Sequence, residues 1–292
     1  MINIGFSGGG YWGSNLVRAA LKVPDVKIVG IADPDPGARQ RIASLVHGDI
    51  NTHSRFDYLL SDKVDAVVIA TPPAFHVEQA VAALKNGKHV FLEKPPAMNL
   101  PDLDRLLEAA RGQTLLCDYI LCYNELIRFA KGLMKEISFV PVITDLKWTN
   151  WGIVRHDVDA WWSVGPHPVS VLCFLFRQIE MGWCKRGNGY ARAHLLADGA
   201  SSLISATWHH PEKRRQVELV GINHSIFVDD VTRKLTVMKH DNMNGRISVP
   251  PIKYSEPLVN ALSDFVKCVR SGEEPVTGPA MIEKVTRLMC NA

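Results

Sequence analysis

The feature that most constrains the fold is a glycine-rich loop between an apolar segment and a helical pattern. Ile2–Phe6 has the character of a buried strand, and Asn15–Lys22 has apolar residues three and four apart, as amphipathic helices do. The loop between them places Gly8, Gly10 and Gly13 in the order G-x-G-x-x-G. This arrangement is typical of a βα turn that binds the phosphates of a dinucleotide. A glycine-rich turn without a ligand is the alternative.

Each residue type in this loop suits phosphate binding. The first glycine allows a tight turn, the second lets a pyrophosphate approach the backbone, and the third lets helix and strand pack closely. The helix that follows offers free backbone N–H groups to an anion. Tyr11 and Trp12 lie in the same turn, and we expect both to contact the cofactor.

An acidic residue stands where a dinucleotide site needs one. Asp33 closes the next predicted strand, twenty residues after Gly13. Its carboxylate suits the ribose hydroxyls and repels a 2′-phosphate, which predicts NAD as cofactor and makes NADP the less favoured choice. Arg39 and Arg41 favour NADP instead, because a nearby arginine accommodates the 2′-phosphate. The other interpretation of Asp33 is that it is the N-cap of the next helix, into which residues 34–36 lead.

The chain alternates strands and helices up to about Gln113, which predicts a doubly wound parallel sheet of α/β class. Beyond Cys122 short strands follow one another, which predicts an α+β domain with a large, mainly antiparallel sheet. We expect a Rossmann domain over residues 1–121 and a domain for substrate binding and oligomerisation over 122–292. Helical patterns expected to cover one face of the second sheet are Asn124–Lys135, Pro166–Leu175 and Leu258–Arg270.

Composition excludes several classes of protein. Among 292 residues, 33 Lys and Arg against 30 Asp and Glu leave too little positive charge for a nucleic-acid binder. The longest apolar run, Val169–Phe176, is far too short for a membrane span. Six cysteines form no CxxC pair, and we expect no metal site. The first ten residues lack the charge of a secretory signal, so we expect a cytoplasmic protein.

Two further segments follow strands at the edge where a doubly wound sheet presents its ligand. One contains Thr71-Pro72 and His76, and the other is Glu93-Lys94-Pro95. Together with the glycine loop they resemble the Gfo/Idh/MocA family of oxidoreductases. The resemblance implies that Lys94 contacts both nicotinamide cofactor and substrate, and that the bond before Pro95 is cis. For His76, a cofactor contact and a solvent-facing position in a helix are equally open.

A third segment includes Gly165 and His167, which match the family pattern, and Ser163 and Ser170, which stand where much of the family has acids. That departure argues against an inositol-dehydrogenase type of site. Preceded by Arg155 to Val158, the segment resembles the branch that acts on nucleotide-linked amino sugars, similar to UDP-N-acetylglucosamine or UDP-N-acetylglucosaminuronate 3-dehydrogenases.

The resemblance implies a hydride transfer between nicotinamide and a ring secondary alcohol or ketone of a sugar, bound between the two domains. Lys94 and His167 are the predicted catalytic residues, with His167 as general base or acid. Competing structural roles are helix capping or packing for His167 and core packing for the aromatic residues. The predicted substrate contacts are Tyr123, Asn124, Arg155, Asp157, Trp162 and His167.

The second sheet also predicts a partner. With helices on one face only, it should bury its other face against a second copy of the chain, and apolar residues of Leu203–Trp208 are expected to supply the contact. The family resemblance implies a homodimer or homotetramer through this sheet. Two other functions stay open: a free-sugar or polyol dehydrogenase, and a dinucleotide-binding sensor without catalysis.

Overall fold

The computed structural model describes residues 1–46, 50–152, 155–240 and 245–292. They form two compact units. The first unit comprises Met1–Asp118 and Glu256–Thr286, and the second comprises Tyr119–Ser255 and Arg287–Ala292. This division differs from the predicted segments 1–121 and 122–292, because a stretch near the end of the chain returns to the first unit.

The first unit is built on a six-stranded sheet in the order β3-β2-β1-β4-β5-β6, in which all neighbours are parallel. This is the doubly wound order of dinucleotide-binding folds, and the predicted α/β class is confirmed. Strands β1, β4 and β5 are nearly all buried, and β4 and β5 are apolar except for His89, as a sheet covered on both faces requires. The strands are β1 (Ile2–Ser7), β2 (Val26–Ala32), β3 (Asn51–His53), β4 (Ala66–Ile69), β5 (His89–Leu92) and β6 (Leu115–Cys117).

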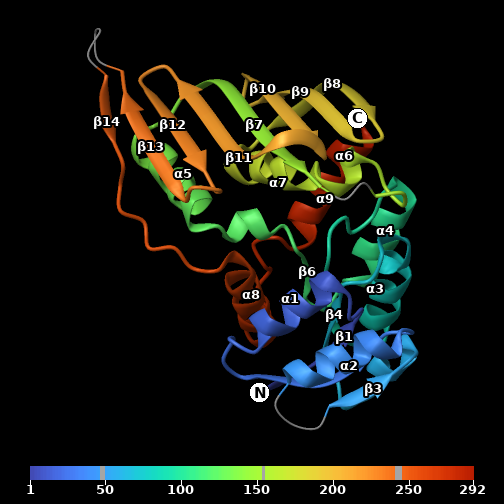
Figure 1. Cartoon of the computed structure of the whole chain (residues 1–292). Helices are drawn as coiled ribbons and strands as arrows, with labels where there is room; N and C mark the ends of the chain where they lie inside the picture. Colours follow the sequence, from blue (N-terminus) through green and yellow to red (C-terminus); the bar gives the residue numbers. More distant parts are fainter. Residues whose placement is uncertain (47–49, 153–154, 241–244) are drawn as a thin grey trace. The chain divides into compact units, whose positions relative to one another are not determined.

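Helices cover both faces of this sheet (Figure 1). Helices α1 and α8 pack against each other on one side and α3 and α4 on the other. Short 3-10 turns, η1 (Phe56–Leu60) and η2 (Pro73–Phe75), lie in the connections. The helices of this unit are α1 (Tyr11–Ala20), α2 (Pro36–Leu45), α3 (His76–Lys85), α4 (Leu100–Ala109) and α8 (Pro257–Ser271).

The position of α8 corrects the sequence prediction. The helix was expected to cover the second sheet, yet it packs on α1 and β5 of the first unit. Its Phe265 is fully buried, and its ring meets that of Phe91 edge to face with centroids 5.8 Å apart. The amphipathic pattern predicted a buried face correctly, but such a pattern does not specify which sheet receives it.

The second unit contains an eight-stranded sheet in the order β14-β13-β12-β11-β7-β10-β9-β8. Its neighbours are antiparallel except for β7 and β10, so the predicted mainly antiparallel sheet is confirmed. The strands are β7 (Pro141–Trp151), β8 (Ile179–Gly187), β9 (Tyr190–Ala197), β10 (Ala200–Thr207), β11 (His209–Gly221), β12 (His224–Asp229), β13 (Lys234–Lys239) and β14 (Arg246–Ser248).

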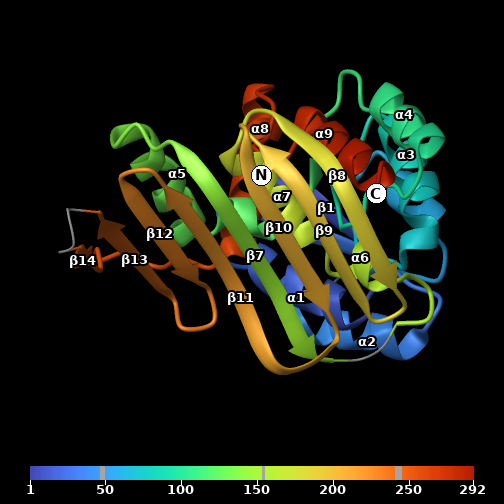
Figure 2. The ribbon, with the colours of Figure 1, turned by 90° about the horizontal axis from the view of Figure 1, so that it is seen from above.

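One face of this sheet carries the helices of the unit (Figures 1 and 2). Helix α5 packs on β12 and β13, α6 on β8 to β10, and α7 on β7 and β10. These helices are α5 (Glu125–Glu136), α6 (Ala160–Ser163) and α7 (Pro166–Leu175), preceded by η3 (Ile120–Tyr123). The residues of α9 (Pro279–Cys290) are divided between the two units.

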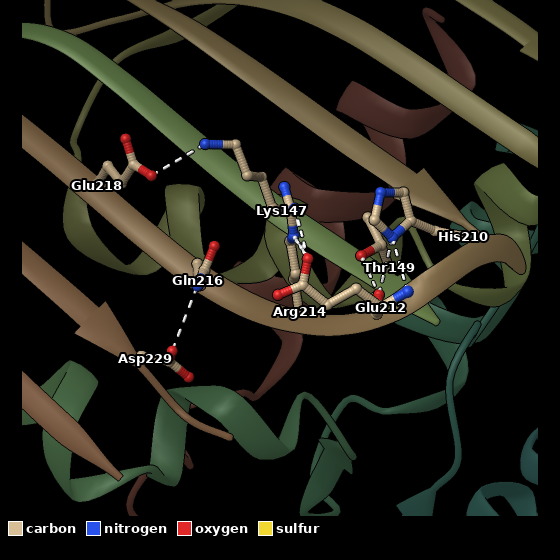
Figure 3. Close-up of polar contacts among 8 residues, drawn as sticks. All are labelled: Lys147, Thr149, His210, Glu212, Arg214, Gln216, Glu218 and Asp229. Atoms are coloured by element: carbon tan, nitrogen blue, oxygen red, sulfur yellow. Dashed lines mark hydrogen bonds and ion pairs between the residues drawn. The ribbon is translucent and has the colours of Figure 1, made fainter. Parts of the chain in front are cut away.

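The opposite face of the sheet is more polar than predicted. Ile204 and Ala206, expected to supply an apolar contact there, are buried on the face that carries α6 and α7. On the outer face Lys147 is paired with Asp145 and Glu218, at 3.0 and 2.9 Å. Figure 3 shows the contact of Lys147 with Glu218 and further, separate polar contacts on β7, β11 and β12, such as that of Gln216 with Asp229. Exposed apolar residues also occur on β7, β8 and β9: Ile143, Trp183, Tyr190 and Leu196.

Candidate functional site

The glycine loop has the geometry that phosphate binding requires. Gly8 has a φ of +94°, and a side chain there would meet the carbonyl oxygen of Ala70 at 2.7 Å. A side chain at Gly13 would lie 2.1 Å from the carbonyl oxygen of Gly8. By contrast, no atom lies within 4 Å of the position that a side chain of Gly10 would take. Backbone atoms therefore pack closely against Gly8 and Gly13, whereas the space beside Gly10 is open.

Helix α1 begins at this open glycine. Gly10 is its N-cap and provides no side-chain hydrogen bond, and the first turn contains no acidic residue. The indole Nε1 of Trp12 is buried and has no hydrogen-bond partner among the described residues, while Tyr11 is 84% exposed. A buried donor without an acceptor is costly. This donor and the free N–H groups of the first turn fit the phosphates of a dinucleotide.

The carboxylate of Asp33 is bound to this loop. Its Oδ2 accepts a hydrogen bond from the backbone N of Gly9 at 2.7 Å, and its Oδ1 accepts one from the N of Asp35 at 2.8 Å. The alternative role as a helix cap is wrong, because Asp35 caps α2 by accepting from Gly37 and Ala38. The carboxylate is only half-buried, so it keeps capacity to accept from ribose hydroxyls.

A guanidinium lies at the same end of β2. Arg39 donates to the carbonyl oxygens of Asp33 and Pro34, at 2.7 and 3.0 Å. Arg41 lies farther out and approaches Asp35 at 3.9 Å. The end of β2 therefore combines a carboxylate that favours a free ribose diol with a cation that favours a 2′-phosphate.

His76 joins two of the loops that the sequence singled out. Its side chain is buried, so the solvent-facing alternative is wrong. Its Nδ1 lies 2.8 Å from the carbonyl oxygen of Pro95, and its Nε2 lies 2.7 Å from that of Thr71. Thr71 also donates its hydroxyl to Gln79 at 3.3 Å, whereas Pro72 is exposed. His76 thus holds together the segments that follow β4 and β5.

Lys94 lies at the carboxyl end of β5 beside two buried carboxyl groups. The lysine is half-buried and precedes a cis peptide bond to Pro95, as the resemblance implied. Burial raises the pKa of Glu93 well above its usual range, and the neighbouring Asp118 adds to the rise. Burial also raises the pKa of Asp118 to about 6, although its hydrogen bond with Glu93 and the charge of Lys94 act in the opposite direction.

In the second unit, two predicted substrate residues have clear structural partners. The side chain of Asn124 is fully buried and caps α5, accepting from the N of Leu126 at 2.9 Å. Its Nδ2 donates to Asp230 at 2.7 Å. Tyr123 is also fully buried, and the guanidinium of Arg128 lies 5.1 Å from the centre of its ring. Both side chains hold η3 and α5 in place.

The other predicted residues lie around α6 and the start of α7. Arg155 binds the exposed Asp157, with 2.9 Å between Nε and Oδ1. This contact lowers the pKa of Asp157, mainly through the hydrogen bond. Trp162 is half-buried in α6, which Asp159 caps. His167 is the second residue of α7 and half-buried, and its carbonyl oxygen accepts from the hydroxyl of Ser170 at 2.9 Å.

Sequence reasoning missed one member of the site, Asp118. It follows β6 directly, just as Glu93 follows β5. The signal was present: an acid after the apolar triplet Leu115–Cys117. That triplet is too short to be recognised as a strand by its own pattern.

Comparison with known proteins finds a family model that matches the amino-terminal part of the chain. Residues 2–119 match the model of the Gfo/Idh/MocA oxidoreductase family, described as an NAD-binding Rossmann fold. The match covers the glycine loop, Asp33, Lys94 and Asp118. The similarity to this family of oxidoreductases therefore rests on residues 2–119.

Several relatives match this chain over less than half of its length, and one matches most of it. A 2,7-anhydro-N-acetylneuraminate hydratase of Escherichia coli K12 is 37% identical over 139 residues, which are 47% of this chain and 36% of that protein. A hydratase of the same name from Mediterraneibacter gnavus is 31% identical over 47% of this chain and 37% of its own. The chain thus matches little more than a third of these relatives. A scyllo-inositol 2-dehydrogenase (NAD(+)) of Bacillus subtilis 168 is 29% identical and aligns over 92% of this chain and 85% of its own.

Solved structures show the same fold over nearly the whole chain. A 3-ketoreductase from Actinomadura kijaniata, solved with TDP-benzene and NADP in an open conformation, superimposes with a TM-score of 0.87 at 20% identity, covering 99% of this chain and 95% of that one. A UDP-N-acetylglucosamine 3-dehydrogenase from Acidithiobacillus ferrooxidans gives 0.86 at 18% identity, covering 99% and 96%. The two-part architecture is therefore that of known oxidoreductases.

Within the described residues, no helix is long and apolar enough to cross a membrane. The described part of the chain also contains no cluster of three or more His, Cys, Asp or Glu side chains suited to a metal ion.

Proposed function

We propose that the protein is an NAD-dependent oxidoreductase that transfers a hydride between nicotinamide and a ring secondary alcohol or ketone of a sugar, with nucleotide-linked sugars as the favoured class. The observation that carries the proposal is the first unit's combination of an open phosphate loop with Lys94 at the end of β5. Both features lie at the carboxyl edge of one parallel sheet, where doubly wound folds bind ligands.

The residues of the first unit divide cofactor binding among them. The N–H groups of the first turn of α1 and the indole of Trp12 suit the pyrophosphate, and Asp33 suits the adenosine ribose. Nicotinamide, when bound, supplies or accepts the hydride. The chain contributes orientation, exclusion of water and handling of the proton.

The proton is assigned to two side chains. In the direction of oxidation, a side chain removes the hydroxyl proton as the hydride leaves the same carbon, and in reduction it returns a proton to the carbonyl oxygen. His167 suits this task because histidine titrates near neutral pH. Lys94 suits the stabilisation of negative charge that develops on the oxygen. The opposite distribution of the two roles is the competing mechanism.

Cofactor preference is tested by fluorescence titration with NADH and NADPH, using two matched variants. Asp33→Asn removes the charge that repels a 2′-phosphate, and Arg39→Gln removes the cation that attracts one. We expect the wild type to bind NADH more tightly, and Asp33→Asn to reduce that preference by about tenfold, equivalent to 1.4 kcal/mol. Tighter binding of NADPH by the wild type, lost in Arg39→Gln, would refute the NAD assignment.

Substrate class is supported by what the relatives are named for. Nucleotide-linked sugars are the substrates named for the dehydrogenase of Acidithiobacillus ferrooxidans, whereas the relative from Bacillus subtilis is named for an inositol. A free-sugar or polyol dehydrogenase is therefore the second candidate. Other relatives are named as hydratases, so the test also follows substrates that are altered without net oxidation or reduction of the cofactor.

One experiment separates these candidates. The protein is incubated with NAD and a panel of nucleotide sugars, free sugars and inositols, while NADH absorbance and product mass are both followed. NADH formation with nucleotide sugars supports the proposal, and formation only with free sugars or inositols supports the alternative. Cofactor binding without any conversion across the panel would identify a sensor and refute both.

A further inference from the structure

Two carboxyl groups lie side by side where β5 and β6 end. The parallel register pairs Leu92 with Cys117, so the next residues, Glu93 and Asp118, are neighbours across the sheet. The backbone N of Asp118 donates to the carbonyl oxygen of Leu92 at 2.8 Å, which continues the pairing to this point. Adjacent strands are about 4.8 Å apart, and each of the two carboxyl groups shifts the pKa of the other.

Almost nothing else in the first unit solvates these oxygens. Glu93 and Asp118 are 6% and 1% exposed. Among the described residues, Oε1 of Glu93 and both carboxylate oxygens of Asp118 find no donor, and Oε2 of Glu93 accepts only from the backbone N of Lys94, at 3.2 Å. Two ionised carboxylates in this position would repel each other without compensation. One shared proton converts the contact into a hydrogen bond.

The charges near the pair are few. Lys94 is the cation that acts on both carboxyl groups. His76, which reaches this region from α3, directs its nitrogens to the carbonyl oxygens of Pro95 and Thr71 instead. A pair holding one proton carries a single negative charge, which matches the single positive charge of Lys94. A buried charge is tolerated when it is balanced in this way.

We propose that Asp118 is a positioning residue for Lys94: with Glu93 it forms a carboxyl pair that holds one proton and one negative charge, and this charge keeps the lysine ammonium at the carboxyl end of β5. The role in turnover rests on the function proposed above. The raised pKa values of both carboxyl groups agree with a retained proton at neutral pH.

The first test needs neither substrate nor cofactor. Infrared spectra of the whole protein at pH 7 should contain the carbonyl band of a protonated carboxylic acid. Asp118→Asn and Glu93→Gln should each abolish it, because an amide donor then satisfies the remaining carboxylate. Asp62→Asn, at an exposed position, is the matched control and should leave the band intact. A wild type without the band would overturn the shared proton, whatever the enzyme's substrate.

The second test uses turnover and separates positioning from a structural role. Each single amide variant keeps one negative charge beside Lys94, whereas the double variant Glu93→Gln/Asp118→Asn keeps none. We expect each single change to lower kcat less than about tenfold and the double change to lower it beyond the product of the two, by roughly 10²-fold or more. Cofactor affinity, followed by fluorescence, should stay within about twofold in all three.

The pH profile supplies a readout that packing would not alter. Wild-type kcat should decline below about pH 6, where the pair takes up a second proton and loses its charge, and the double variant should lack this decline. A folded double variant with wild-type kcat and an unchanged pH profile would refute the proposal. If no substrate turns over in the wild type, the proposed function fails, while the infrared result still decides whether the pair shares a proton.

Discussion

Replacing both Glu93 and Asp118 with their amides should stabilise the protein, and the gain should grow with pH. The folded state holds the proton of Asp118 more tightly than the unfolded chain does, because burial raises the pKa of this carboxyl from 3.8 to about 6. The protonated group therefore favours folding at low pH, and this contribution is lost as the pH rises through about 6. Glutamine and asparagine have the same shapes as the two acids and no proton to lose.

The size of the effect follows from the two pKa values of Asp118, folded and unfolded. They differ by a little over two units, and each unit corresponds to about 1.4 kcal/mol. The double variant Glu93→Gln/Asp118→Asn should thus gain at least about 3 kcal/mol at pH 8, where Asp118 is ionised in the folded protein, and less at pH 5, where ionisation in the folded state has barely begun. Near pH 3 the variant and the wild type should be equally stable.

Hydrogen exchange of peptides from β5 and β6, measured by mass spectrometry at pH 5 and pH 8, reports the opening free energy of this region. Asp62→Asn serves as the exposed control and should show no pH-dependent gain. A double variant that is destabilised at pH 8, or that gains more at pH 5, would refute the reasoning, because either result means that the native carboxylate is stabilised by its surroundings.

Three further outcomes follow from the site and the second sheet. Lys94→Met and His167→Asn should each lower turnover by roughly 10²–10⁴-fold, with cofactor binding retained. Their effects on kcat should be non-additive in the double variant. Additive losses in steady-state kinetics would mean that the two residues do not share one proton transfer. Gly13→Ala should lower the melting temperature, because the new side chain would lie 2.1 Å from a carbonyl oxygen. Gly10→Ala should keep the melting temperature and weaken cofactor binding by about tenfold or more. Equal effects of the two substitutions on melting temperature and on cofactor binding would contradict the described loop. Light scattering should give a dimer or tetramer formed through the second sheet, and a mass near 32.4 kDa at micromolar concentration would contradict it.

The first sheet was predictable because its signals are local. An apolar run, a glycine loop and a helical pattern follow one another within Ile2–Lys22, so short-range physics specifies both the elements and their order. Strand β8 (Ile179–Gly187) was missed because charged residues and a glycine interrupt its alternation. Its identity depends on pairing with β9, a contact that no single segment of sequence displays.

The site was predictable where the backbone itself carries the function. Gly8 and Gly13 adopt the geometry expected of them, because only glycine fits beside the neighbouring carbonyl oxygens. The hydrogen-bond partners of side chains were harder to predict from the sequence. The choice of Asp35 over Asp33 as helix cap depends on a single turn of backbone, and the pairing of Glu93 with Asp118 depends on the register of two strands.

The discontinuity of the first unit sets the order in which the protein can mature during synthesis. Strand β6 lies at the edge of its sheet, and Thr277 covers it: the N of Cys117 donates to the carbonyl oxygen of Thr277 at 3.0 Å, and the hydroxyl of Thr277 donates back to Cys117 at 2.7 Å. On the ribosome this edge, together with the face of Phe91 that Phe265 covers, stays open until the residues after 255 have emerged. The first unit, whose translation begins first, is therefore completed only after residues 119–255 of the second unit have been made.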